Sequence, residues 1–190
     1  MSLVMAFSGM SRAVMAGDQR EIFFQGEESR IGILLAELNS NLLTDDEQLH
    51  SRAKELGIAI TIRDDKCKVT SRDGVLIGEV TETDGPESRR RRLCVSCGKY
   101  AIIEKTGPEW TVLSRGEGSH FLVLGNDATK AIAYNCIQKH WNPGGGTRED
   151  AVKVLILSMQ EAAKRTASVS SAFSIIQTQT RAEVPGTTCL

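Results

Sequence analysis

The chain has 190 residues, of which 41% are hydrophobic, 25% charged and 5% aromatic, with a formal net charge of -1. These values favour one globular domain with an aliphatic core and exclude global disorder. The small net charge gives no electrostatic reason to expect nucleic acid or a membrane as a partner. No apolar run approaches the ~20 residues of a membrane span, and the N-terminus lacks the basic segment of a signal peptide. Five unevenly spaced cysteines favour a reducing compartment. We therefore expect a soluble cytoplasmic or nuclear protein.

The first third of the chain predicts a hairpin, a third strand and two helices. Apolar residues 3–7 and 12–16 flank Ser8-Gly9-Met10, a pattern typical of two strands joined by a turn. The apolar run 22–24 predicts the third strand. Ser29 is the expected N-cap of a first helix. Residues 44–47 fit a capping box for a second helix, which Gly57 would end.

The middle of the chain predicts short strands. Before residue 82 the candidate strands are 58–62, 67–70 and 75–80, and after residue 92 they are 93–97, 100–103 and 110–113. Between them, residues 82–92 read as a polar loop that ends in four arginines, 89–92. We expect this run to be a solvated loop rather than a phosphate-binding or nuclear-localisation patch.

The last third gives the clearest pattern. A buried strand is expected at 121–124, followed by a helix from Ala128, a glycine-rich loop at 142–146, and a long helix opened by Thr147 and Asp150. A closing strand is expected at 172–178. Residues 1–179 would then form a single domain, and residues 180–190 a flexible C-terminal tail.

No complete set of catalytic residues is visible. Cys94 and Cys97 form a CxxC pair, but no second pair and no nearby histidine complete a zinc site, so two packed strand cysteines are expected. Asp127 follows an apolar strand, a position that suits either a metal ligand or the N-cap of the next helix. Its spacing favours the cap.

The order of these elements resembles the C-terminal two-thirds of the type 2C metal-dependent protein phosphatases. Residues 8–14 resemble that family's Gly-Asp-Ser-Arg-Ala-Val, residues 93–96 its Leu-Ala-Val-Ser, and residues 121–127 its Phe-Leu-Val-Leu-Ala-Ser-Asp. The strand at 173–176 stands where the family has its final strand. The resemblance implies an α+β fold of antiparallel sheets layered with helices, a partial α/β/β/α sandwich with open sheet edges.

The departures from that pattern imply a catalytically degenerate, phosphatase-like protein. Enzymes of the family use two Mg²⁺ or Mn²⁺ ions. Here the N-terminal ligand segment is absent, Met10 replaces an acid, and no acid stands at Ser170 or Ser171. Asp127 remains as a vestigial metal-ligand candidate and Arg12 as a phosphate-binding candidate. The resemblance thus predicts a non-catalytic pseudophosphatase without a cofactor that acts by binding or regulating a protein partner, such as a phosphoprotein or a related phosphatase, with a homodimer as a further option.

Two alternatives stay open. One is an active metal-dependent serine/threonine phosphatase that uses substitute ligands for Mg²⁺ or Mn²⁺. The other is an enzyme of the N-terminal nucleophile, proteasome-like family, whose helix, loop, helix and strand ending resembles residues 126–176. That family needs two strands and a processed Thr or Ser at its very start, which would require removal of Met1 to expose Ser2. The first half of the chain fits this family less well.

Overall fold

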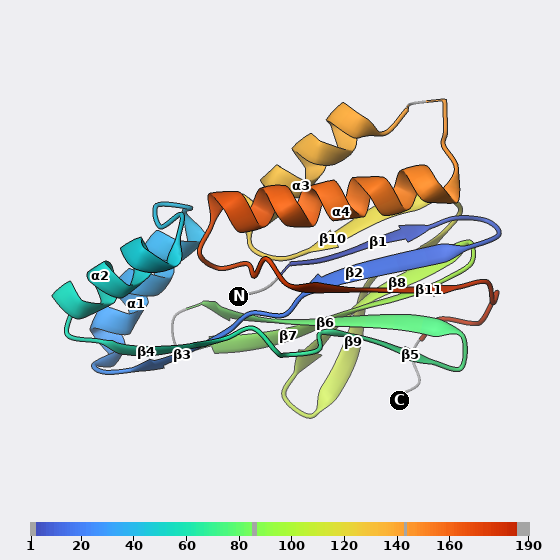
Figure 1. Cartoon of the computed structure of the whole chain (residues 1–190). Coiled ribbons are helices and arrows are strands. Elements are labelled where there is room, and N and C mark those ends of the chain that lie inside the picture. The colour runs from blue at the N-terminus through green and yellow to red at the C-terminus, as the bar shows by residue number, and fades with distance from the viewer. Residues whose placement is uncertain (1–2, 85–86, 143, 186–190) are drawn as a thin grey trace.

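In the computed structural model, which describes residues 3–84, 87–142 and 144–185, two sheets pack face to face beneath a pair of helices (Figure 1). A smaller unit of two helices and a two-stranded ribbon stands beside the sheets. The general expectation of an α+β fold with antiparallel sheets is confirmed. No helix among the described residues is long and apolar enough to cross a membrane.

The first sheet contains the predicted N-terminal hairpin. Its strand order is β10-β1-β2-β11, and every neighbouring pair is antiparallel. The bounds are β1 (Val4–Ser8), β2 (Ala13–Asp18), β10 (His120–Leu124) and β11 (Phe173–Thr178). Alternate side chains of a strand face opposite sides, so Met5 packs toward the helices and Val4 toward the second sheet. Because both faces of the sheet are covered, all six residues of β2 are buried.

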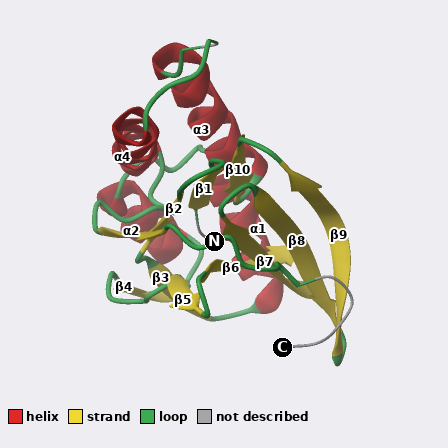
Figure 2. Cartoon of the chain, turned by 90° about the vertical axis from the view of Figure 1, so that its right-hand side faces the viewer, coloured by secondary structure: helices red, strands yellow, loops and turns green. Residues whose placement is uncertain are grey.

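Helices α3 (Asp127–His140) and α4 (Arg148–Arg165) cover one face of this sheet (Figure 2). The expected capping box of Thr147 and Asp150 is confirmed at the start of α4. The expected cap of α3 is wrong by one residue. Asn126 accepts the hydrogen bond from the Thr129 amide, and Asp127 is the first residue of the helix. An amide oxygen one residue earlier satisfies the free N–H, and the Asp127 carboxylate then lies in the first turn, where the helix dipole favours it.

The second sheet is a five-stranded meander with the order β5-β6-β7-β8-β9. Its strands are β5 (Val69–Arg72), β6 (Val75–Asp84), β7 (Glu87–Ser96), β8 (Lys99–Thr106) and β9 (Glu109–Glu117). The predicted loop at 82–92 is therefore wrong for its described part, and residues 85–86 lie outside the described residues. The arginines lie in β7, where Arg92 and Arg90 pair with Glu79 across the strands and Arg92 stacks on Trp110, 4.3 Å from its ring centre. Cross-strand charge pairs of this kind hold a polar sequence in a sheet.

The described residues beyond β11 pack against the outer face of the second sheet. Ala182 and Val184 cover the buried side chains of Cys94 and Ile103, and the Ser96 hydroxyl donates to the carbonyl of Ala182 over 2.7 Å. This differs from the flexible tail expected from residue 180, because apolar side chains at alternate positions find a partly apolar sheet face. The expectation also covered residues 186–190, which lie outside the described residues.

The smaller unit holds α1 (Glu28–Asn39), α2 (Asp46–Glu55), β3 (Glu21–Gln25) and β4 (Ala59–Arg63). Its core is formed by leucines of both helices and by Ile58. The expected caps differ here: Glu27 stands at the N-cap of α1 in place of Ser29, and Asp45 caps α2 by accepting from the Gln48 amide. Gly57, with φ of 70°, ends α2 as expected.

Gly78 makes the close approach of the two sheets possible. A Cβ added there would overlap Val4 and lie 2.9 Å from the Met15 sulfur. We expect Gly78→Ala to lower the free energy of unfolding by about 1–3 kcal/mol through overpacking. In the matched control Gly32→Ala, in α1, the added methyl meets no atom within 4 Å, and helix propensity should raise stability by about 0.5–1 kcal/mol. Urea denaturation distinguishes the two, and equal effects would contradict this account of the interface.

Candidate active site

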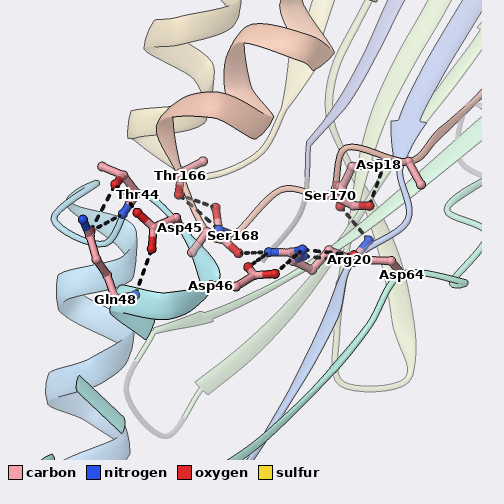
Figure 3. Close-up of polar contacts among 12 residues, drawn as sticks. Asp18, Arg20, Thr44, Asp45, Asp46, Gln48, Asp64, Thr166, Ser168 and Ser170 are labelled. Atoms are coloured by element: carbon pink, nitrogen blue, oxygen red, sulfur yellow. Dashed lines mark hydrogen bonds and ion pairs between the residues drawn. The ribbon is translucent and has the colours of Figure 1, made fainter. Parts of the chain in front are cut away.

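Several segments that are far apart in the sequence meet at the C-terminal end of β2 (Figure 3). Asp18, the last residue of β2, accepts hydrogen bonds from the backbone N–H groups of Leu3 and Arg20 over 2.7 and 2.8 Å. The Nζ of Lys68, just before β5, lies 2.8 Å from the same carboxylate. The start of the first strand is thereby fixed to a carboxylate and, through it, to an ammonium group.

This acid–lysine pair is closed off from solvent. The side chains of Asp18 and Lys68 are 0% and 3% exposed. Burial lowers the pKa of Lys68, because desolvation penalises its charged form, while Asp18 opposes that effect by attracting the charge. Desolvating two ions costs several kcal/mol for each, so such a pair is a poor device for stability alone. Perturbed ionisable groups of this kind concentrate at functional sites.

A second polar layer surrounds the pair. Arg20, which is 7% exposed, pairs with Asp64 through Nε over 2.9 Å and with Asp46 through Nη1, and it donates to the carbonyl oxygen of Ala167 over 2.8 Å. One guanidinium, from the segment after β2, therefore joins α2, the segment after β4 and the turn after α4. Its hydrogen bonds hold the pKa of Asp64 below its usual value.

The turn between α4 and β11 adds buried hydroxyl groups. Thr166, Ser168 and Ser170 are all 0% exposed. The hydroxyls of Thr166 and Ser168 lie 3.0 Å apart, and the Ser170 hydroxyl accepts from the Ala172 amide over 2.9 Å. Figure 3 shows Ser170 beside Asp18 and Ser168 near Arg20. The sequence pattern gives Ser170 no role beyond a position where the phosphatase family has an acid.

The site residues expected from the sequence lie elsewhere. Arg12 is at the opposite end of β2, in the turn of the hairpin. Asp127 has a fully exposed side chain, 3.4 Å from Lys130. Among the residues that the structure describes, no group of three or more His, Cys, Asp or Glu side chains could hold a metal ion. The structure thus brings neither Arg12 nor Asp127 to the acid–lysine pair.

The CxxC cysteines are packed in the second sheet. Cys94 and Cys97 are both free, and each is 1% exposed. Cys94 belongs to the cluster on the outer face of the sheet, whereas Cys97 contacts the Thr178 carbonyl with its sulfur. Burial raises the pKa of Cys94 to about 11, so its thiol is protonated at neutral pH. The prediction of two packed cysteines is confirmed, but only Cys94 lies in a strand, because β7 ends at Ser96 and Cys97 lies in the turn that follows.

The fold and the site together define a class: a layered α+β domain whose first strand starts at a buried acid–lysine pair. The chain belongs to the family described as "Connectase MJ0548-like, N-terminal domain", whose model matches residues 1–187. This assignment overturns the resemblance to type 2C phosphatases. That resemblance was the basis for the expected pseudophosphatase function and for a phosphoprotein or phosphatase partner. Neither expectation is supported any longer. Binding of another protein and homodimer formation stay predictions.

No curated protein shows significant similarity to the chain. Among solved structures, HslV from Trypanosoma brucei is 16% identical, with 92% of this chain and 98% of that one covered and a TM-score of 0.42. Anbu, an ancestral β-subunit from Yersinia bercovieri, is 10% identical, with 93% and 80% covered and a TM-score of 0.40. Anbu from the helical assembly of Pseudomonas aeruginosa is 11% identical, with 92% and 80% covered and a TM-score of 0.41. TM-scores of this size do not establish a common fold.

Proposed function

We propose that this protein is an N-terminal nucleophile enzyme of the proteasome-like kind, in which Ser2 attacks an amide carbonyl after Met1 has been removed. The observation that carries the proposal is the hydrogen bond from the Leu3 amide nitrogen to Asp18, together with the contact of Asp18 with Lys68. Residues 1–2 lie outside the described residues. The Leu3 nitrogen is, however, the amide nitrogen of the Ser2–Leu3 peptide bond. The Asp18 carboxylate therefore fixes the residue that follows the nucleophile.

The chemistry requires a base for the hydroxyl proton. A free α-amino group has a pKa of about 7.7–8.0 and is a known base for an N-terminal Thr nucleophile. In the proposed reaction the Ser2 oxygen bonds to the carbonyl carbon while its proton passes to the α-amine. That proton then moves to the departing amine as the C–N bond breaks, leaving an ester. Water attacks the ester, releases the carboxylic acid and restores the hydroxyl.

Lys68 and Asp18 act on this reaction without being consumed. The Lys68 ammonium places a positive charge in a dry site, where charge interactions are stronger than in water, and this favours the deprotonated hydroxyl and the developing oxyanion. Asp18 holds both Lys68 and the Leu3 amide, so it fixes the direction in which the chain leaves the nucleophile.

The experiment combines intact mass with a serine-directed label. We expect the purified protein to have lost Met1 and to bind one fluorophosphonate group through the Ser2 oxygen, with release of fluoride. Ser2→Ala should abolish labelling, and Ser2→Thr should retain it, because both hydroxyls are nucleophiles. Peptide mass spectrometry locates the label.

A matched control is Ser114→Ala, which removes an exposed hydroxyl in β9 and should leave labelling unchanged. Retention of Met1 in active preparations, or equal labelling of wild type and Ser2→Ala, would overturn the proposal.

A further inference from the structure

A pocket of about 390 Å³ opens beside the β1–β2 hairpin, at the opposite end of these strands from Asp18. Two remote segments complete it: Ser119, just before β10, and the first turn of α4. The pocket therefore stands apart from the acid–lysine pair, and its capacity to bind a ligand does not depend on Ser2 being a nucleophile. The side chains that matter most to its chemistry are Phe7, Ser11, Arg12, Ser119, Arg148 and Glu149.

Arg12 is the unusual member of this lining. Its side chain is half-buried, yet among the residues that the structure describes no carboxylate lies within 4.0 Å of its guanidinium, and no acceptor receives a hydrogen bond from it. A guanidinium carries five N–H donors in a planar fork. Arg12 therefore presents a cation with its donor groups unused at the wall of a cavity.

A second guanidinium lines the same space. Arg148 is bound to Glu149 through Nη2 over 2.6 Å and through Nε over 2.9 Å, and its Nη1 lies 3.4 Å from the Gln177 amide oxygen. Glu149 neutralises only one of the two arginines. The lining therefore keeps one uncompensated positive charge, which attracts an anionic ligand.

Part of the pocket lining is apolar. Phe7 belongs to an aromatic cluster with Phe121 and Trp141, whose ring centres lie 4.8 to 5.1 Å apart. Gly146 lines the pocket at its edge, and a Cβ there would lie 2.9 Å from the Trp141 ring. Val14 completes the apolar side. The lining thus combines cationic donors with aromatic and aliphatic side chains, a combination typical of small-molecule sites.

We propose that this pocket binds a small molecule that carries a phosphate or carboxylate group on a flat apolar body. Arg12 takes the oxyanion through its planar fork, which matches the geometry of phosphate and carboxylate. Arg148, whose charge Glu149 balances, and the exposed hydroxyls of Ser11 and Ser119 supply further hydrogen-bond donors, and the body lies against Phe7. The sequence suggested Arg12 as a phosphate-binding residue through the phosphatase resemblance, which is wrong. The pocket gives an independent reason for it.

The test is calorimetric titration of the full chain with phenyl phosphate, benzoate and inorganic phosphate. We expect saturable binding of phenyl phosphate and benzoate, and weaker binding of inorganic phosphate, which lacks the apolar body. Arg12→Met should weaken phenyl phosphate binding about tenfold or more, as expected for the loss of a hydrogen bond to a charged group. Arg12→Lys should restore binding only in part, because it keeps the charge and loses the fork.

The matched control is Arg115→Met, which removes an exposed arginine of β9 outside the lining. Equal weakening in Arg115→Met and Arg12→Met would show attraction to net charge and overturn the site. No saturable binding of any probe would overturn it as well, once the melting curve shows a folded protein. Inorganic phosphate binding as tightly as phenyl phosphate would remove the apolar body from the proposal, and phenyl phosphate binding unchanged in Arg12→Met would remove Arg12.

Discussion

Lys68→Met is expected to lower the free energy of unfolding by about 3–5 kcal/mol and to abolish labelling of Ser2. The loss of stability arises because the substitution leaves the Asp18 carboxylate, which is 0% exposed, as an uncompensated buried charge. The loss of labelling arises because the ammonium that favours the deprotonated hydroxyl is gone. Urea denaturation measures the first effect, and fluorophosphonate labelling under conditions where the variant is folded measures the second.

Two further variants separate these effects. Lys66→Met removes an ammonium two residues away that is 48% exposed and pairs with Glu21, so it should change stability and labelling little. The double variant Asp18→Asn, Lys68→Met removes both buried charges and keeps an amide oxygen for the Leu3 N–H. It should regain much of the lost stability without regaining labelling. Full labelling in the stable double variant would show that the pair is only structural.

The hairpin and the helices were predictable because each depends on local patterns. Apolar residues on both sides of a Gly-containing turn predicted β1 and β2, and Thr147 with Asp150 predicted the start of α4. The acid–lysine pair was not predictable in the same way, because Asp18 and Lys68 meet only when the two sheets pack. One signal was available. Asp18 ends an apolar strand, which is the same pattern that drew attention to Asp127.

The phosphatase resemblance gave a wrong family because its motifs describe local structure. Phe121 to Asp127 is an apolar strand followed by Gly, Asn and Asp, a sequence that suits any buried strand leading into a capped helix. It therefore carries information about local structure and almost none about chemistry. In the structure Asp127 serves the first turn of α3 and is exposed. A site whose ligands come from several segments cannot be transferred from one such motif.

The strand that contains the arginine run 89–92 depends on residues of neighbouring strands, which the local sequence does not reveal. The sequence predicts a solvated loop at residues 89–92 because Asp84, Gly85 and Glu87 adjoin them, and a single sequence does not show which charges lie opposite one another. In the folded chain Glu79 and Glu104 stand on the neighbouring strands and pair with Arg92 and Arg91. The charges therefore stabilise the strand pairing that their polarity had argued against.

Arg20→Met is expected to lower the free energy of unfolding by about 2–3 kcal/mol, since hydrogen bonds to charged groups contribute about 1.5–3 kcal/mol and Arg20 makes several. It should also reduce Ser2 labelling. Without the guanidinium, the segments that carry Asp46, Asp64 and Ala167 are no longer bound to residue 20, which lies two residues after Asp18. The matched control is Arg52→Met, which breaks the more exposed pairs with Glu37 and Glu55 in the smaller unit and should leave labelling intact.

The same variant has a pH signature that distinguishes loss of the ion pairs from loss of packing. The pKa of Asp64 is lowered in the folded protein, chiefly by the hydrogen bonds from Arg20. Its contribution to stability is therefore complete above the unfolded carboxyl pKa of about 3.9 and disappears as the pH falls through the lower folded value. Wild type and Arg20→Met should accordingly differ most at neutral pH and approach each other below about pH 4. A difference in stability that does not depend on pH would mean that Arg20 acts through the packing of its aliphatic stem, and that the guanidinium does not hold the site together.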